Sequence, residues 1–150
     1  MTSQCIGGEL ETQEEGGGSI VALIDNRARE VGFAAFNSST LTLSLCQYIE
    51  SGSAAAVTTA MLLKLHDARE AVLLAPHRPT GNAANSPNSP VQQAGPSLPD
   101  VRHFLPRSSF DDSKGLVAIE TCAVQASWDK LCRATAAGGG NAGFYLACGA

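Results

Sequence analysis

The feature that most constrains the fold is a change of hydrophobic period along the chain, near residue 53. Before it, residues 20–24 (IVALI) are apolar throughout, as in a strand buried on both faces. Residues 31–36 and 41–46 are also strand-like, and in the second of these segments leucines alternate with Thr, Ser and Cys. The NSST stretch at 37–40 has turn chemistry. Three strands joined by short connections predict an antiparallel meander.

After this point, helical and strand-like segments alternate. Ser53 is a suitable N-cap for an Ala- and Leu-rich helix of about three turns at 54–66. The apolar run at 71–75 predicts a strand that returns parallel to the first one, because a helix precedes it. The VRHFL segment at 101–105 predicts a fifth strand.

Two further helices are expected toward the end of the chain. Asp111 or Asp112 can cap the first of them. Its apolar positions have helical spacing: Leu116, Ile119 and Ala123. Trp128, Leu131 and the closing GFYLACGA suggest the second helix.

The predicted order is therefore β-β-β-α-β-(loop)-β-α in one domain over residues 19–150. This is the ribonuclease-H-like arrangement, an α/β fold with a mixed five-stranded sheet and flanking helices. The sheet consists of a three-strand antiparallel meander plus parallel strands. A chain of 150 residues has room for one such core.

Two regions are expected to be disordered. Residues 1–18 form an acidic, Gly-rich tail with little to bury. All seven prolines lie between residues 76 and 106, and residues 76–100 are rich in Pro, Asn and Ser with almost no apolar content. We expect the 76–100 stretch to be a mobile insertion that adds no packed element to the domain.

The charge distribution argues against autonomous DNA binding. The net charge of −4 comes entirely from the tail, which holds four Glu and no Lys or Arg. From residue 19 onward, ten acidic residues balance ten basic ones. A domain that neutralises phosphates usually carries a basic excess, because counterion release drives the binding.

Cysteine usage indicates an intracellular compartment. The cysteines are Cys5, Cys46, Cys122, Cys132 and Cys148. Their number is odd and they form no C-x-x-C pair, which fits reduced thiols better than a disulfide framework. The sequence shows neither an apolar stretch long enough to span a bilayer nor a signal peptide.

Asp25, directly after the first strand, is the candidate for catalysis. In metal-dependent nucleases of the ribonuclease-H-like fold, several carboxylates converge to hold two Mg²⁺ ions, one of them at this position. Here the 71–75 strand brings no Asp or Glu. Glu50, Asp67 and Glu70 are expected at the wrong end or at the edge of the sheet. Asp25 is therefore predicted to serve a turn or a cap, and a small nuclease that uses Asp25 is the alternative function.

Other chemical motifs are weaker. Asp111 and Asp112 lie near the place of a later metal ligand, but a helix cap explains them better. Three histidines are scattered along the chain: His66, His77 and His103. Neither a phosphate-binding loop nor a G-x-S-x-G motif occurs, so no catalytic, cofactor-binding or metal site is predicted. Arg27 and Arg29 could contact phosphate or a neighbouring domain. Together with the Pro-rich stretch they are exposed candidates for the surface that meets a partner subunit.

Three stretches point to a family: NRAREVGFAAFN at 26–37, LSLCQYIES at 43–51 and SSFDDSKGLVAIE at 108–120. They resemble the connector domain, the second domain, of MutS-family DNA mismatch-repair proteins, and look most like the meiotic branch of that family, the fourth eukaryotic MutS homologue. The resemblance covers about residues 19–75 and 101–133, with FYLACGA as a weaker continuation. Its most specific piece is the F-D-D-S-K-G run ahead of an apolar helix.

The resemblance implies a ribonuclease-H-like fold without nuclease chemistry, in a non-catalytic connector module of a nuclear, chromosomal protein. It implies that the full-length protein pairs with a second MutS homologue, the fifth eukaryotic one. That heterodimer would clamp around mismatched or branched DNA such as Holliday junctions and promote meiotic crossovers. ATP and Mg²⁺ would bind in an ATPase domain that this chain lacks, and the connector would help to relay the nucleotide state.

The chain departs from the family in three respects. It has no ATPase and ends inside the connector, so it is expected to be an N-terminal fragment, truncated at the C-terminal end of this domain. Its 76–100 stretch is longer and richer in Pro, Asn and Ser than the family pattern. No F-x-E mismatch-reading motif is present, which fits the meiotic branch, whose members lack the mismatch-reading domain.

The interrupted last helix and the 76–100 insertion predict marginal stability for this chain on its own. We expect cooperative thermal unfolding at or below about 50 °C, toward the low end of the range for mesophile domains. Circular dichroism during heating measures the midpoint. A cooperative transition well above that temperature would contradict the expectation.

Overall fold

The computed structural model describes residues 17–52, 55–75, 89–137 and 148–150. The strands are β1 (Ser19–Asp25), β2 (Glu30–Asn37), β3 (Thr42–Ile49), β4 (Ala68–Leu74) and β5 (Val101–Leu105). The helices are α1 (Val57–Leu65), α2 (Pro90–Gln93), α3 (Asp112–Cys122) and α4 (Gln125–Ala137). Two short 3-10 turns are η1 (Gly95–Ser97) and η2 (Arg107–Ser109).

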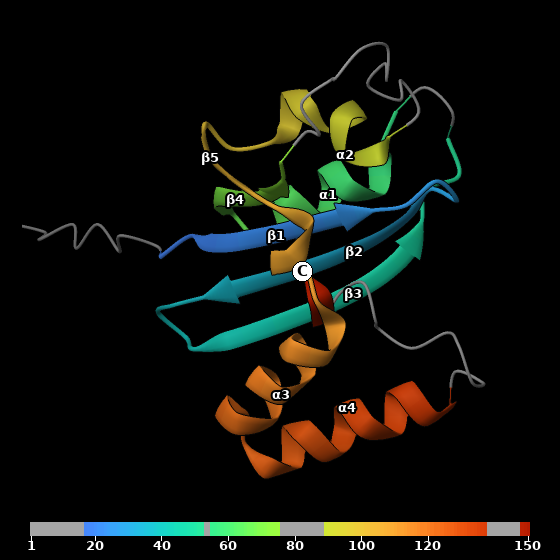
Figure 1. The fold of residues 1–150 in the computed structure, drawn as a ribbon. Helices are drawn as coiled ribbons and strands as arrows, with labels where there is room; N and C mark the ends of the chain where they lie inside the picture. Colours follow the sequence, from blue (N-terminus) through green and yellow to red (C-terminus); the bar gives the residue numbers. More distant parts are fainter. Residues whose placement is uncertain (1–16, 53–54, 76–88, 138–147) are drawn as a thin grey trace, which may run out of the picture.

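The strands form one mixed sheet in the order β3-β2-β1-β4-β5, with β1 at its centre (Figure 1). β1 pairs antiparallel with β2, which pairs antiparallel with β3. β4 and β5 continue the sheet parallel to β1. The predicted α/β fold is confirmed, because the meander, the parallel strands and the flanking helices are all present in the ribonuclease-H-like order.

Asparagine side chains build both hairpin turns of the meander. Asn26 Oδ1 accepts hydrogen bonds from two backbone N–H groups of the first turn, at 3.0 and 3.1 Å. Asn37 Oδ1 accepts from Ser39 N–H and Thr40 N–H, both at 3.0 Å. This is the local side-chain-to-backbone bonding that favours Asn in turns, and it confirms the turn expected at 37–40.

One face of the sheet carries the core. Its strand residues alternate along each strand: Val21, Leu23, Val31, Phe33, Ala35, Ala71 and Leu73. α1, α2 and η1 cover this face, and the core side chains that they and their flanks contribute include Ala56, Leu63, Ala94 and Leu98. Phe33 is fully buried, and its ring centroid lies 5.4 Å from that of His66, the C-cap of α1.

The prediction that residues 76–100 add no packed element is wrong for residues 89–98, which we call the strap. Ser89 is the N-cap of α2, with Pro at the start of the helix. Pro90, Ala94 and Leu98 are buried, because a spacing of four residues places them on the same side of this segment. The low overall hydrophobicity of the stretch concealed these positions. Residues 76–88 lie outside the described residues.

Burial of β1 differs from the expectation at one end of the strand. Val21 and Leu23 are fully buried on the core face, but Ile20 on the opposite face is 42% exposed. The expectation that the whole run 20–24 is buried on both faces is therefore wrong for Ile20. Ile24, farther along the same face, is buried at 4% exposure.

The helix starts also differ in detail from the prediction. Asp111 is the N-cap of α3 and accepts from Ser113 N–H at 3.0 Å and Lys114 N–H at 3.2 Å, which confirms the expected cap. α1 begins at Val57, and the proposed cap Ser53 lies outside the described residues. α4 confirms the second helix expected toward the end of the chain. Residues 1–16, most of the tail expected to be disordered, and residues 138–147 also lie outside the described residues.

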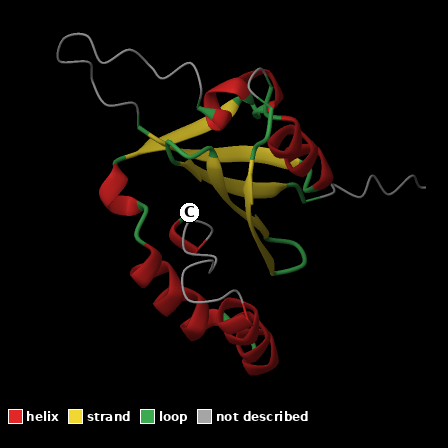
Figure 2. Cartoon of the chain, turned by 90° about the vertical axis from the view of Figure 1, so that its right-hand side faces the viewer, coloured by secondary structure: helices red, strands yellow, loops and turns green. Residues whose placement is uncertain are grey.

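α3 and α4 form a helical hairpin that projects away from the sheet, remote from α1 and α2 (Figures 1 and 2). None of the described side chains on α3 or α4 is buried. Within the part of the chain that the structure describes, no helix is long and apolar enough to cross a membrane.

Leu98→Ala tests whether the strap is part of the core. We expect the free energy of unfolding to fall by about 2–3 kcal/mol, because a nearly buried leucine loses its packing and leaves a cavity. Urea denaturation followed by circular dichroism measures the change. The control is Gln92→Ala at an exposed strap position, with an expected change within about 0.5 kcal/mol. Equal effects of both substitutions would show that the strap is not packed.

Candidate functional site

Asp25 closes the central strand, where a nuclease of this fold would bind metal. Its Oδ2 atom accepts hydrogen bonds from Ser89 Oγ at 2.5 Å and from Val91 N–H at 3.1 Å. Both donors lie at the start of α2, where backbone N–H groups have no partner within the helix. Asp25 therefore acts as a cap, as the sequence predicts, but the helix that it caps belongs to the strap.

Arg29 ties three chain segments together at the same end of the sheet. It has a left-handed backbone conformation, with φ 60. Its guanidinium donates to the Glu50 carbonyl oxygen at 3.0 Å, to the Gly52 carbonyl oxygen, and to Gln93 Oε1 at 3.0 Å. Arg29 thus links the first hairpin to the β3–α1 connection and to the strap. Of the two arginines expected to be exposed, Arg27 is exposed, whereas Arg29 is half-buried by these internal contacts.

Glu50, directly after β3, is a buried carboxylate with 2% exposure. Glu50 Oε1 accepts from Thr59 N–H at 2.7 Å and from Thr59 Oγ at 2.8 Å. Because Thr59 lies in the first turn of α1, Glu50 supplies the cap that the residue at the N-cap position, Ala56, cannot provide. The Tyr48 hydroxyl lies 2.9 Å from Thr59 Oγ, and burial raises the pKa of Tyr48.

The topology explains why these acidic residues do not converge. β3 runs parallel to β1, so Glu50 lies at the same end of the sheet as Asp25, but it follows an edge strand and points into α1. Asp67 and Glu70 lie at the other end, before and at the start of β4. Asp67 pairs with Arg69 at 3.0 Å. In the described residues, no group of three or more His, Cys, Asp or Glu side chains is placed to hold a metal ion.

The histidines and cysteines are also dispersed. His103 Nε2 lies 2.9 Å from Glu70 Oε2 on the exposed side of β4 and β5, and His77 is outside the described residues. Among the described residues no disulfide is formed. Burial raises the pKa of the Cys46 thiol, and burial together with the nearby Asp112 carboxylate raises that of Cys148. Both thiols are therefore less reactive at neutral pH than an exposed cysteine.

Sequence reasoning missed the two strap residues that complete this end of the sheet, Ser89 and Gln93. The signal for Ser89 is local, because a Ser followed by Pro is a common start of a helix. The contacts that they make are not local. Ser89 meets Asp25 across 64 residues, and Gln93 meets Arg29 across the same separation.

A comparison with known proteins identifies one relative. The chain is 32% identical over 106 residues to the DNA mismatch repair protein MSH4 of Arabidopsis thaliana. This chain is related to the MutS family. The matched region is 71% of the chain but 13% of the MSH4 sequence, so the chain spans a small part of that relative's length. No family model matches the chain.

Glu50→Ala tests the buried cap. We expect the free energy of unfolding to fall by about 2–3 kcal/mol, because the buried N–H of Thr59 loses its acceptor and α1 loses its cap. Urea denaturation measures the change. Glu120→Ala, at an exposed position on α3, is the control and should change stability by less than about 0.5 kcal/mol. If both variants unfold at the same urea concentration, the cap does not stabilise the fold.

Proposed function

We propose that this chain is a non-enzymatic connector module of a MutS homologue that acts in meiotic recombination. The observation that carries the proposal is the 32% identity to MSH4 over 106 residues. The ribonuclease-H-like strand order supports the assignment to the connector, because the sequence resemblance implies this same fold for the connector domain.

The geometry at the end of β1 supports the non-enzymatic part of the proposal. Asp25 uses Oδ2 to accept from the start of α2, and Glu50 uses Oε1 to accept from the start of α1. Each carboxylate therefore serves a different helix instead of a common ligand. No observation favours the alternative, a nuclease that depends on Asp25.

In this proposal the chain is part of a longer nuclear protein, and the remaining functions of the family belong to that protein. That protein would pair with a second MutS homologue, bind mismatched or branched DNA, and hold ATP and Mg²⁺ in its ATPase domain. The connector would transmit changes between the DNA clamp and the ATPase. The neutral balance of charged residues from residue 19 onward supports a linking role better than direct contact with phosphates.

Sequencing of the transcript beyond the Ala150 codon tests the assignment to the family architecture. We expect the reading frame to continue into lever and clamp domains and a Walker A motif. A stop codon directly after Ala150 in every transcript would count heavily against a connector role.

A DNA-binding assay with the 150-residue chain tests the non-enzymatic role. We expect no binding of a fluorescent four-way junction at physiological salt and no Mg²⁺-dependent cleavage of it, because the domain has no basic excess and its carboxylates are engaged in caps. Fluorescence anisotropy and denaturing gels are the readouts. Cleavage by the wild-type chain that Asp25→Asn abolishes would establish the nuclease instead.

A further inference from the structure

Ser89 combines a recognisable dipeptide with a contact that a phosphate group would break. It stands directly before Pro90, and a Ser followed by Pro is the dipeptide that proline-directed protein kinases modify. The sequence holds one other such dipeptide, Ser86 with Pro87. Ser89 is half-buried at the start of the strap. The surroundings of its hydroxyl therefore determine what a phosphate at this position would do.

The hydroxyl of Ser89 is held at the carboxyl end of β1. Its Oγ atom donates to Asp25 Oδ2 at 2.5 Å and accepts from Gln92 N–H at 3.3 Å. The same carboxylate oxygen accepts from Val91 N–H at 3.1 Å. Asp25 thus holds the start of the strap through two donors, and one of them is the hydroxyl that a kinase would modify.

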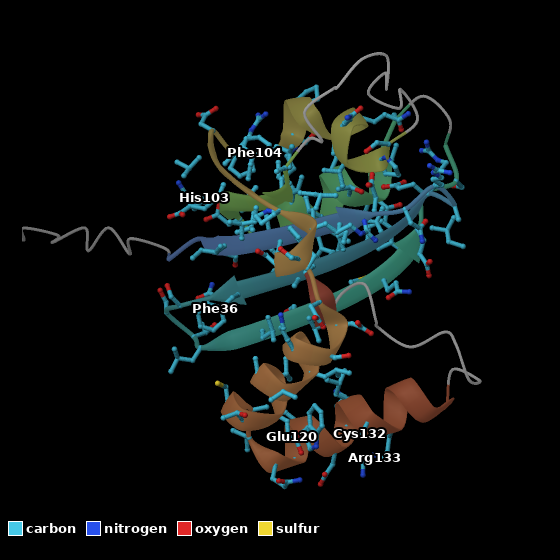
Figure 3. All side chains as sticks on the ribbon, viewed as in Figure 1. Phe36, His103, Phe104, Glu120, Cys132 and Arg133 are labelled. Carbon is cyan, nitrogen blue, oxygen red and sulfur yellow. The ribbon has the colours of Figure 1, made fainter. Side chains whose placement is uncertain are left out.

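The rest of the strap covers the core. Pro90, Ala94 and Leu98 are buried, and Gln93 Oε1 accepts from the Arg29 guanidinium at 3.0 Å. Figure 3 shows α2 over the same face of the sheet as α1, with side chains filling the layer between these helices and the strands. The cover that the strap gives to the core therefore begins at the bond between Ser89 and Asp25.

Phosphoryl transfer from ATP would convert the Ser89 hydroxyl into a phosphate ester. The Oγ atom attacks the γ-phosphorus, the bond from that phosphorus to the β–γ bridging oxygen breaks, and ADP leaves. The hydroxyl proton passes to the catalytic carboxylate of the kinase. The donor to Asp25 is lost in this step, and a group with a charge of about −1.5 to −2 takes its place.

Two negative groups would then face each other at a half-buried position. The phosphorus is bonded directly to Oγ, so the phosphate oxygens would lie beside the Asp25 carboxylate. Like charges in close contact repel, and partial burial weakens the screening by water and salt. The Arg29 guanidinium, which contacts the strap at Gln93, also donates to the carbonyl oxygens of Glu50 and Gly52. The strap would relieve the repulsion by moving away from the end of β1.

We propose that Ser89 is a phosphorylation site for a proline-directed kinase and that its phosphate releases the strap from the core. The kinase would act on copies of the chain in which the strap has opened locally, because it reaches the hydroxyl only after the bond to Asp25 is broken. The phosphate then opposes reclosure, since the closed strap would place it against Asp25. This inference does not rest on the proposed connector function.

Incubation of the 150-residue chain with a purified proline-directed kinase and ATP tests the modification. We expect mass spectrometry of proteolytic peptides to find phosphate on Ser89. Leu98→Ala, which loosens the strap, should be modified at Ser89 at least about tenfold faster. Glu50→Ala, with a similar expected loss of stability outside the strap, is the control and should match the wild-type rate. Absence of phosphate on Ser89, or equal rates for both variants, overturns the proposal.

Hydrogen–deuterium exchange of the phosphorylated chain tests the release. We expect the backbone N–H groups of Val91, Ala94 and Leu98 to exchange at least about tenfold faster than in the unmodified chain, with β1 unchanged. Ser89→Ala removes the same hydrogen bond without adding charge, so it should accelerate exchange much less. Unchanged or slower exchange overturns the proposal, because the phosphate would then be tolerated or paired with a cation such as Arg29. Equal acceleration in β1 overturns it too, because the whole domain would then be affected.

Neutral substitutions of Asp25 separate charge repulsion from the size of the phosphate. The amide oxygen of Asp25→Asn can still accept from Val91 N–H but carries no charge, so phosphorylation should accelerate strap exchange much less in this variant. Asp25→Ser is a second neutral variant, and circular dichroism confirms that each one is folded. If phosphorylation has the same effect in the wild type and in the neutral variants, release by repulsion from Asp25 is wrong.

Discussion

Burial of one face of the sheet beneath α1 and the strap is the interaction on which the rest of this structure depends. β1 is the central strand, and Val21 and Leu23 reach the core between buried neighbours on β2 and β4. A sheet with one covered face must fix the register of every strand, because a slip of one residue would move its apolar side chains to the other side. The helices that cover the face must in turn be held at their ends.

Polar groups at the carboxyl end of β1 hold those helices. Asp25 accepts from the first residues of the strap, Glu50 accepts from the first turn of α1, and Arg29 bonds to the backbone that follows Glu50. A carboxylate stabilises a helix N-terminus because the N–H groups there are unpaired and the helix dipole is positive. In metal-dependent nucleases of this fold, carboxylates at the carboxyl end of the central strand bind the catalytic metal ions. In this chain the carboxylates at that end stabilise helix N-termini.

The opposite face of the sheet is only partly covered. Ile20, Phe36 and Leu43 are side by side yet exposed, and the α3–α4 hairpin beyond them buries none of its described side chains. A domain that leaves apolar rows and helices without full cover is typical of a part that meets another molecule or another domain. The relation to a much longer MutS-family protein fits such a part, since the matched region is 13% of MSH4.

The sequence by itself determined the five strands and the helices α1, α3 and α4. Continuous apolar runs and alternation with a period of two predicted the strands, and Asp111 ahead of an apolar helix predicted the cap of α3, since these signals lie within a few neighbouring residues. Only the tertiary structure decided that the Pro-rich strap is part of the core and that Asp25, Arg29 and Glu50 hold it and α1 in place. Ser89 is separated from Asp25 by 64 residues, and such contacts arise only when the sheet has brought distant segments together. A pattern of neighbouring residues cannot predict a contact across a separation of 64 residues.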